Sequence, residues 1–415
     1  MVGAACEIKR DITAQTIEKH INLLYSRTAN YQLLTTHLYK KTLFLTLRVF
    51  SATGGIEKVC RLVGKALYEL GLQYGGITEV YSMYGKPDSA DGNKYFPQLL
   101  FKGFSDNKIG FVLKSIAAGR RSDVVIMSHI NLLVVGYLVK FFKPSVKMML
   151  IAHGIEVWKP LPGWKKYMLR KCDLILPVSH FTKDRMVELH GLPGDKFSVF
   201  NNCLEPFLEK PLTGRKSPAL LERYGLVKSN RILLTVSRMA DSEQYKGYDK
   251  VLTALPELIK GYPDLRYMLV GKYDTNEKKR LDRVIDGLGL HDVVIFTGFV
   301  QDEEMAAHFN LGDIFIMPSE KEGFGIVFIE AMFYGLPVIA GNKDGSTDAL
   351  WNGELGTLID PDNNDEIVSA IKNMLNYPER YIPSEDKLHE RFSYTWYKRK
   401  LKNCLERVDL KVGSG

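Results

Sequence analysis

Residues 319–332 read Ser-Glu-Lys-Glu-Gly-Phe-Gly-Ile-Val-Phe-Ile-Glu-Ala-Met and are the most informative segment of the chain. It follows the apolar segment Asp313–Pro318, which predicts a β-strand, and it continues into an apolar run that predicts a buried helix. A strand, a glycine-containing turn and a helix together present backbone N–H groups to an anion. We therefore expect a phosphate group to bind where this helix starts, at Phe324, Gly325 and Ile326.

Two acidic side chains flank this turn. Glu330 lies within an apolar run, where an ionised carboxylate is unfavourable unless a polar group meets it. A carboxylate only accepts hydrogen bonds, so its natural partners are a pair of hydroxyl groups, such as those of a ribose, or an Arg or Lys side chain. Glu322 precedes the turn at the expected carboxyl edge of the sheet, where open α/β sheets bind ligands. The alternative is that Glu322 is a surface residue and Glu330 belongs to a structural ion pair.

Glu322 and Glu330, separated by seven residues that include Gly323–Gly325, resemble the signature of the retaining glycosyltransferases of family 4. The resemblance extends from Lys41 to the C-terminal region. It implies the GT-B fold, an α/β architecture of two Rossmann-like domains whose parallel sheets face each other across an interdomain cleft. It also implies that Glu330 holds the ribose of a nucleoside-diphosphate sugar and that Glu322 holds hydroxyl groups of the donor sugar.

The composition is that of an ordinary globular protein. The 415 residues exceed the size at which a single core stops growing, so two domains of roughly 200 residues each are expected. Hydrophobic residues make up 45% and charged residues 25%, which excludes disordered and fibrous classes. No apolar run approaches the length that spans a bilayer. The five cysteines are odd in number and lack metal-ligand spacing, which favours reduced thiols and a cytoplasmic setting.

The pattern of apolar and polar segments divides the chain into four parts. Residues 1–40 form an N-terminal extension that lacks the apolar core of a signal peptide. Residues 41–205 predict a Rossmann-like domain, on the acceptor side in the resemblance, and residues 206–390 predict the nucleotide-sugar-binding one, after a proline-interrupted boundary. Residues 391–415 predict a helix with interleaved aromatic and basic residues, which we expect to pack back on the first domain.

A glycine turn follows the first predicted strand of the first domain, Thr42–Phe50. Gly54 and Gly55 precede a helix predicted over Ile56–Leu70 and ended by Gly71. Such a turn lets a ligand approach the backbone closely, and a simple tight turn is the equal alternative. In the resemblance, Gly54 and Gly55 lie near the diphosphate and the acceptor. Apolar segments predict later strands of a parallel sheet at 77–81, 123–127, 147–151, 173–176 and 196–200.

His153 directly follows one of these strands, which places its imidazole at the carboxyl edge of the sheet. A histidine there can donate a hydrogen bond or carry charge near neutral pH. The alternative is a histidine bonded to its own loop. In the resemblance, His153 is the active-site histidine that contacts the transferred sugar.

Two cations share one loop after the first predicted strand of the second domain. Arg238 ends that strand and Lys246 precedes the next helix, an arrangement suited to a diphosphate, although a solvated loop is the alternative. They match the phosphate-binding Arg and Lys of the family, with a longer spacing than many members have. Gly298 follows another strand and lies near the nucleotide base in the resemblance. No metal site is expected, because Asp360–Asp362 reads as a turn without a third acid.

Basic and aromatic residues alternate in two short segments of the first half, Lys140–Lys147 and Trp164–Lys171. This mixture suits an anionic membrane surface, and a solvated helix face is the alternative. Asn131–Phe142, which overlaps the first segment, is very apolar and predicts either a buried crossover helix, the interpretation we favour, or a membrane-facing one.

The resemblance implies a metal-independent, retaining hexosyltransferase that needs no cofactor. Its donor is a UDP- or GDP-sugar and its acceptor a glycan or a lipid-linked saccharide, in cell-surface polysaccharide or glycolipid synthesis. We expect a cytoplasmic protein, peripheral on the inner face of the membrane in one alternative, with no nucleic-acid partner. A non-catalytic sugar-nucleotide-binding scaffold is the rival hypothesis. An NAD-dependent oxidoreductase is disfavoured, because neither domain opens with the full glycine fingerprint.

Overall fold

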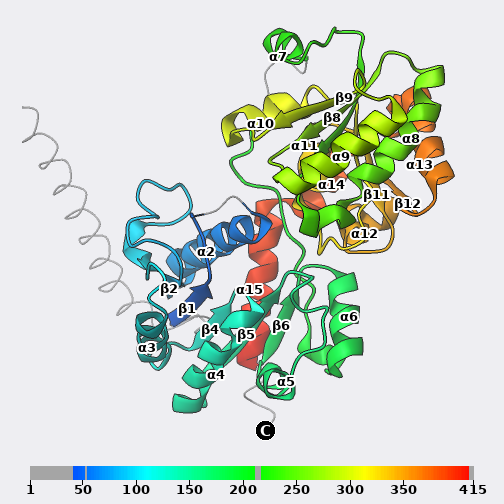
Figure 1. Cartoon of the computed structure of the whole chain (residues 1–415). Helices are drawn as coiled ribbons and strands as arrows, with labels where there is room; N and C mark the ends of the chain where they lie inside the picture. Colours follow the sequence, from blue (N-terminus) through cyan, green and yellow to red (C-terminus); the bar gives the residue numbers. More distant parts are fainter. Residues whose placement is uncertain (1–40, 52–53, 211–215, 411–415) are drawn as a thin grey trace, which may run out of the picture.

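The computed structural model describes residues 41–51, 54–210 and 216–410, which form two domains (Figure 1). The strands of the first domain are β1 (Lys41–Thr46), β2 (Ile77–Ser82), β3 (Phe101–Gly103), β4 (Val124–Met127), β5 (Lys147–Ala152) and β6 (Leu174–Pro177). Its helices are α2 (Gly55–Tyr74), α3 (Lys108–Gly119), α4 (Leu133–Phe142), α5 (Gly163–Arg170) and α6 (His180–His190).

The second domain follows the interdomain linker. Its strands are β7 (Arg231–Val236), β8 (Leu265–Val270), β9 (Val294–Gly298), β10 (Ile314–Met317), β11 (Val338–Gly341) and β12 (Thr357–Ile359). Its helices are α7 (Pro218–Arg223), the 3-10 helix η4 (Asp241–Lys246), α8 (Tyr248–Gly261), α9 (Thr275–Leu288), α10 (Asp302–Phe309), α11 (Ile326–Phe333), α12 (Ser346–Ala349), α13 (Asn364–Asn376) and α14 (Glu385–Phe392). A last helix, α15 (Tyr394–Leu410), ends the described chain.

Each domain is built on a six-stranded parallel sheet. The strand orders are β3-β2-β1-β4-β5-β6 and β12-β11-β10-β7-β8-β9. Counted along the chain, the first sheet has the order third, second, first, fourth, fifth, sixth, which is the Rossmann order and confirms the predicted fold. The second sheet is also parallel and has its first strand, β7, in the middle. Ligands of such sheets bind beyond the carboxyl ends of the strands where the order reverses, between β1 and β4 in the first sheet and between β7 and β10 in the second.

The strands form where the sequence is almost continuously apolar. In β4, β6, β10 and β11 every residue is buried, as expected for strands covered by helices on both faces. The strand predicted at 196–200 is wrong, since only an isolated bridge joins Phe197 to Ile175. The segment still runs along β6, since the N–H groups of Ser198 and Phe200 donate to the carbonyls of Ile175 and Pro177 at 3.0 and 2.8 Å, but it forms no regular strand. The Phe200 ring lies against that of Tyr397, 4.3 Å between centroids. The three-residue strand β3 was too short to predict.

Helix α2 is longer than predicted. It continues through Gly71 to Tyr74 and ends at Gly75, whose φ of 76° is the left-handed conformation that favours glycine. Gly71 lies inside the helix, where a Cβ would press on the carbonyl of Gly76. Glycine is therefore needed at Gly71 for close packing rather than for the helix end.

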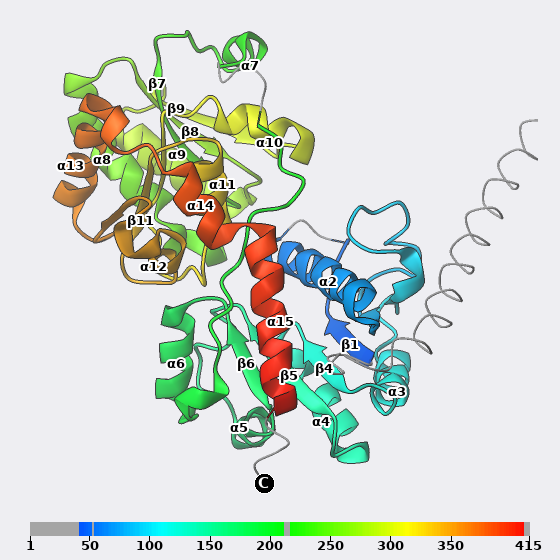
Figure 2. The same cartoon turned by 180° about the vertical axis from the view of Figure 1, so that it is seen from behind.

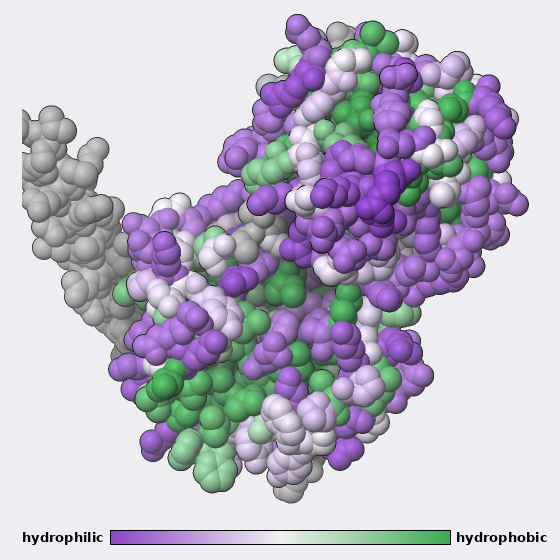
Figure 3. All heavy atoms as spheres, in the orientation of Figure 1, coloured by the Kyte–Doolittle hydropathy of each residue, from purple (hydrophilic) through white to green (hydrophobic). Residues whose placement is uncertain are grey.

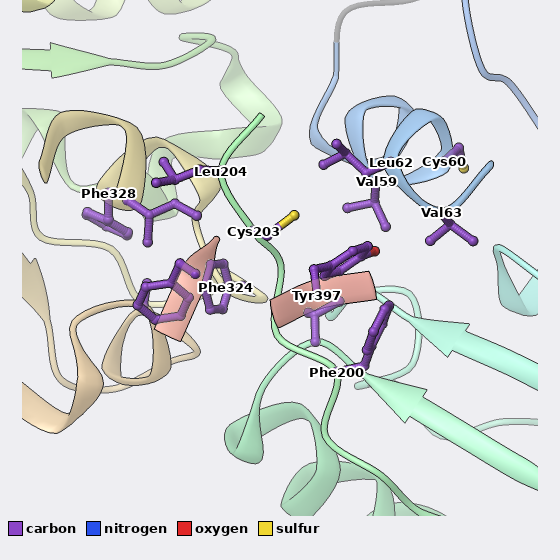
Figure 4. Close-up of a cluster of buried hydrophobic side chains, with 14 of the residues drawn as sticks. Val59, Cys60, Leu62, Val63, Phe200, Cys203, Leu204, Phe324, Phe328 and Tyr397 are labelled. Atoms are coloured by element: carbon purple, nitrogen blue, oxygen red, sulfur yellow. The ribbon is translucent and has the colours of Figure 1, made fainter. Parts of the chain in front are cut away.

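Three clusters of buried hydrophobic side chains hold the layers together. One lies between the first sheet and α3, α4 and α5, and another between the second sheet and α8, α9 and α13. The third runs from α2 through the linker to α11, α14 and α15, so the two domains share one continuous core. Figure 4 shows its middle, where Cys203 and Leu204 of the linker lie between Tyr397 and Phe324.

Helix α15 returns from the second domain to the first and lies beside α2 (Figure 2). Lys398 pairs with Glu69 of α2 at 2.7 Å, and Arg407 donates to the carbonyl of Phe197 at 3.0 Å. Within residues 41–51, 54–210 and 216–410, no helix has both the length and the apolar character needed to cross a bilayer.

Candidate functional site

The loop after β10 carries Glu322 and is held by a buried aspartate, Asp344. One Asp344 oxygen accepts hydrogen bonds from the backbone N–H of Glu322 at 2.7 Å and from Ser319 Oγ at 2.8 Å. The other accepts from the backbone N–H of Ser346 at 2.9 Å. The Glu322 carbonyl also accepts from Gly345 at 2.8 Å. Asp344, which the sequence analysis did not single out, therefore fixes the backbone from which Glu322 projects.

Glu322 is held in an environment that disfavours its charge. Burial raises its pKa above the ordinary value, and only Lys246 opposes this, while Asp344 and Glu243 raise the pKa further. A carboxyl group of this kind gains from hydrogen bonds that a ligand donates, such as those from sugar hydroxyls.

The His153 loop of the first domain touches this loop of the second. A Cβ on Gly323 would collide with the backbone carbonyl of His153, so only glycine permits the approach. His153 Nε2 lies 2.7 Å from the carbonyl of Ser128, after β4, and its backbone N–H donates to Glu156 at 2.6 Å. The Ser128 carbonyl thus orients the imidazole, while the backbone of His153 contacts the Glu322 loop.

His129 lies next to His153 and was not predicted, although it too follows a strand, β4. Burial lowers its pKa, Glu156 opposes this, and the charges of His153 and Lys165 lower the pKa further. Its Nδ1 accepts a hydrogen bond from the N–H of Asn131 at 3.1 Å. Two imidazoles therefore share this edge of the first sheet.

The two predicted phosphate-binding cations are held together by one carboxylate, Glu243. Arg238 and Lys246 both pair with it, Lys246 at 3.0 Å. Burial opposes ionisation of Glu243, but the two cations outweigh this effect and hold its pKa below the usual value. The loop is fixed to the Glu322 loop, because Glu320 donates its backbone N–H to the carbonyl of Tyr245 at 2.9 Å. The cations thus lie at the point where the strand order reverses, between β7 and β10.

Glu330 pairs with Lys58, which belongs to α2 of the first domain. The carboxylate side chain is 9% exposed and the lysine side chain 30%. Burial lowers the pKa of Lys58, but the Glu330 carboxylate outweighs this and raises it overall. Of the two kinds of partner considered from the sequence, hydroxyl groups and a cation, the structure shows the cation.

The remaining predicted residues surround this group. Gly325 lies at the start of α11, which has no side-chain cap, so its first two N–H groups, those of Ile326 and Val327, are open. Phe324 is buried and meets the ring of Phe392 at 5.6 Å, which leaves only its backbone to face a ligand. Gly54 precedes α2, whose start also lacks a side-chain cap. Gly55 begins α2, and Gly298 ends β9 at the edge of the second sheet.

A hollow of about 1020 Å³ opens in the first domain, beyond the carboxyl ends of β1, β2 and β3. Arg48, Tyr84 and Lys86 line it, and the guanidinium of Arg48 lies 5.2 Å from the Tyr84 ring centre. On its rim, Ser105 and Asp106 both have positive φ values, 48° and 68°. Consecutive non-glycine residues in this conformation are strained, and such strain concentrates at functional sites.

The described residues contain no group of three or more His, Cys, Asp or Glu side chains that could hold a metal ion. The groups that the structure does assemble are two cations with the open start of a helix, two acids, and an imidazole from the opposite domain. Cations and helix N–H groups can bind a diphosphate, and acids and imidazole can bind hydroxyl groups.

Comparison with known proteins agrees with this arrangement. Residues 53–206 match the family model described as Glycosyltransferase Family 4, and residues 217–399 match Glycosyl transferases group 1. The fold is similar to that of Anabaena HepE, solved with UDP and glucose, with a TM-score of 0.72 and 20% identity over 89% of this chain and 100% of that one.

Two curated relatives show sequence similarity. A GDP-mannose-dependent alpha-(1-6)-phosphatidylinositol monomannoside mannosyltransferase of Mycolicibacterium smegmatis is 32% identical over 55% of this chain and 60% of its own length. An uncharacterized glycosyltransferase of Haemophilus influenzae is 28% identical over 84% of this chain and 94% of its own. This chain spans about three fifths of the length of the first of these relatives. The chain belongs to the glycosyltransferases of family 4, with the GT-B fold.

Proposed function

We propose that this protein is a retaining, metal-independent hexosyltransferase that uses a UDP- or GDP-sugar. The observation that carries the proposal is the contact between the His153 loop and the Glu322 loop. The Glu322 loop is bonded in turn to the loop of Arg238 and Lys246, which supports a site shared by these groups.

Each group has a role in the proposed reaction. Arg238, Lys246 and the first N–H groups of α11 neutralise the diphosphate as it leaves, and preorganised groups of this kind are typically worth about a hundred- to a thousandfold in rate. Glu322 and His153 hold the donor sugar, and Glu330 holds the ribose after releasing Lys58. The bond from the anomeric carbon to the phosphate oxygen breaks as the acceptor oxygen bonds on the same face. The acceptor proton passes to the leaving phosphate oxygen.

The acceptor in this proposal is a saccharide or a lipid-linked saccharide bound to the first domain. The hollow beside Arg48 and Lys86 supports this position, because it opens at the same edge of the sheet as His153. The phosphatidylinositol mannoside in the name of the mycobacterial relative supports a lipid-borne acceptor in glycolipid or surface-polysaccharide synthesis. We also propose that the protein acts in the cytoplasm, at the inner face of the membrane.

Thermal-shift measurements with UDP, GDP and their sugars test donor binding first. A ligand at a hundred times its Kd stabilises the folded chain by about 2.7 kcal/mol, so the correct base is recognisable. Donor hydrolysis and transfer to saccharide acceptors are then measured for the stabilising donor. Stabilisation without hydrolysis or transfer to any acceptor would favour the scaffold hypothesis, and no stabilisation by any nucleotide would reject both.

A further inference from the structure

The outer helical layer of the first domain exposes large apolar side chains where a water-facing layer would be polar. Two protrude from α3, two from the end of α4 and two from α5: Ile109, Leu113, Phe141, Phe142, Trp164 and Tyr167. Each is at least half exposed, from 50% for Tyr167 to 75% for Ile109. Figure 3 shows hydrophobic side chains gathered over the region where Figure 1 places α3 and α4. Contiguous exposed apolar surface of this kind marks an interaction site.

These side chains belong to one continuous surface. Helix α3 packs on α4, and α4 packs on α5. The rings of Tyr137 and Tyr167 meet at 5.9 Å and join α4 to α5. The opposite sides of the same helices are buried against the sheet, for example Val139 and Leu169, so the exposed residues are not displaced from a core. The favoured sequence interpretation of a buried helix therefore applies to one side of α4 and not to Phe141 and Phe142.

The charges carried by the three helices have one sign. None of the three helices contains an Asp or Glu, whereas together they carry Lys108, Lys114, Lys140, Lys165, Lys166 and Arg170. Asp106 and Asp173 pair with Lys108 and Lys140. In the described part of the chain, no acid pairs with Lys114, Lys165, Lys166, Arg170 or the following Lys171. The Nζ atoms of Lys165 and Lys171 lie 5.6 and 5.1 Å from the ring centres of Trp164 and Tyr167.

We propose that these exposed apolar residues, with the five cations that have no acidic partner, form a docking surface for an anionic lipid bilayer. We call it the basic-aromatic face. Aromatic and aliphatic side chains enter the boundary between headgroups and acyl chains, while Lys and Arg reach the lipid phosphates. A second protein with an acidic, apolar surface would match less well, because in α5 the exposed rings of Trp164 and Tyr167 are interleaved with Lys165, Lys166 and Arg170 instead of forming a separate patch.

The face also lies close to the proposed site. Lys165 of α5 donates a hydrogen bond to Asn131 Oδ1 at 3.4 Å, and the backbone N–H of Asn131 donates to His129 Nδ1 at 3.1 Å. Docking through α5 would therefore place the strand ends of the first sheet beside the lipid surface. This orientation rests on the proposed function, whereas docking itself does not.

Co-sedimentation of the full chain with lipid vesicles tests the face without any donor or acceptor. Vesicles of phosphatidylcholine alone are compared with vesicles containing roughly one third phosphatidylglycerol, at low and high salt. We expect binding to the anionic vesicles, weaker binding at high salt, and little binding to the neutral ones. Absence of binding to the anionic vesicles would overturn the proposal. Vesicle binding by a chain without transferase activity would keep it and reject the proposed function instead.

Two test variants, each with a matched control, distinguish binding through the basic-aromatic face from nonspecific binding to lipid. Phe141→Ser with Phe142→Ser should weaken binding at least tenfold, because two inserted rings are lost. Tyr377→Ser with Ile382→Ser, at exposed positions of the second domain, should leave binding unchanged. Lys114→Glu with Lys171→Glu should weaken binding by about 25-fold or more, at roughly fivefold for each lost charge. The control for charge, Lys279→Glu with Arg283→Glu on α9, should have little effect.

The main alternative to a lipid bilayer on this face is a second copy of this chain. The oligomeric state of the protein distinguishes the two. Analytical ultracentrifugation of the unmodified chain and of the Phe141→Ser, Phe142→Ser variant should show the same species. A dimer that dissociates in the variant would assign the face to self-association and overturn the proposal. Undiminished vesicle binding by the variant would also overturn it.

Discussion

The two domains are built on the same kind of sheet but differ in the chemistry of their surfaces. In the second domain, the outer helices α8, α9 and α13 each contain acidic residues, as water-facing helices usually do. In the first, α3, α4 and α5 contain none and expose large apolar side chains instead. The strand ends differ as well, since the second sheet presents paired cations and Glu322, and the first presents imidazoles. In the functions proposed above, one architecture therefore binds an anionic, water-soluble donor in one half and a different partner in the other.

The largest expected effect comes from Glu322, the acid that distinguishes the second domain. Glu322→Gln should lower the rate of transfer by about a hundred- to a thousandfold, because the charge that holds the donor hydroxyls is lost. Folding should be intact, since burial already disfavours the ionised form. Steady-state transfer and thermal unfolding measure the two effects. Glu320→Gln, on the same loop but paired with Lys250, is the matched control, and half or more of the wild-type rate in Glu322→Gln would contradict the assignment.

The ion pair between the domains tests how far the two halves depend on each other. Lys58→Met should lower the free energy of unfolding by about 2–4 kcal/mol, because it leaves the Glu330 carboxylate buried without a partner. Urea denaturation measures the loss. Adding Glu330→Gln to Lys58→Met should recover much of the stability, since no buried charge remains. A double variant no more stable than Lys58→Met would show that the lysine stabilises by packing rather than by charge.

The fold could be predicted because it depends on local patterns. Apolar strands, glycine turns and the spacing of Glu322 and Glu330 are all readable in single segments, and strands followed by glycine turns recur in both domains. Side-chain partners that lie far apart in the sequence were not readable. Lys58 and Glu330 are 272 positions apart, and no segment of the chain indicates that α2 reaches α11.

The parts of the site that were missed are mostly internal counter-charges. Glu243 lies between Arg238 and Lys246 in the sequence, so an acidic residue near these cations was visible there. Its pairing with both of them depends on the fold of η4, which the sequence does not show. Asp344 lies in a glycine-bounded turn, and only the packing of β10 beside β11 brings it under Glu322. Sequence patterns identify groups that face a ligand more readily than groups that hold them in place.

A pH series compares the half-buried acid Glu322 of the second domain with its neutral substitute. Since the pKa of folded Glu322 is raised above the ordinary value of 4.5, its protonated form stabilises the fold below that value. This contribution is lost as the pH rises through the raised pKa. The free energy of unfolding of Glu322→Gln should therefore increase relative to that of the wild type as the pH rises. The gain is about 1.4 kcal/mol for each tenfold decrease that folding causes in the acid dissociation constant of Glu322. Parallel curves of unfolding free energy against pH would contradict the raised pKa.

The smallest expected effect concerns the carboxylate that occupies the cations of the second domain. Glu243 pairs with both Arg238 and Lys246, so a diphosphate must displace it before both cations can bind phosphate oxygens. Glu243→Gln removes this competition and should tighten the binding of UDP or GDP about two- to fivefold, the scale of a partly exposed ion pair. Isothermal titration measures the change, with Asp241→Asn of the same loop as the control. Weaker nucleotide binding in Glu243→Gln would instead mean that this carboxylate positions the cations, and the charges of the second domain would then be organised before the donor arrives.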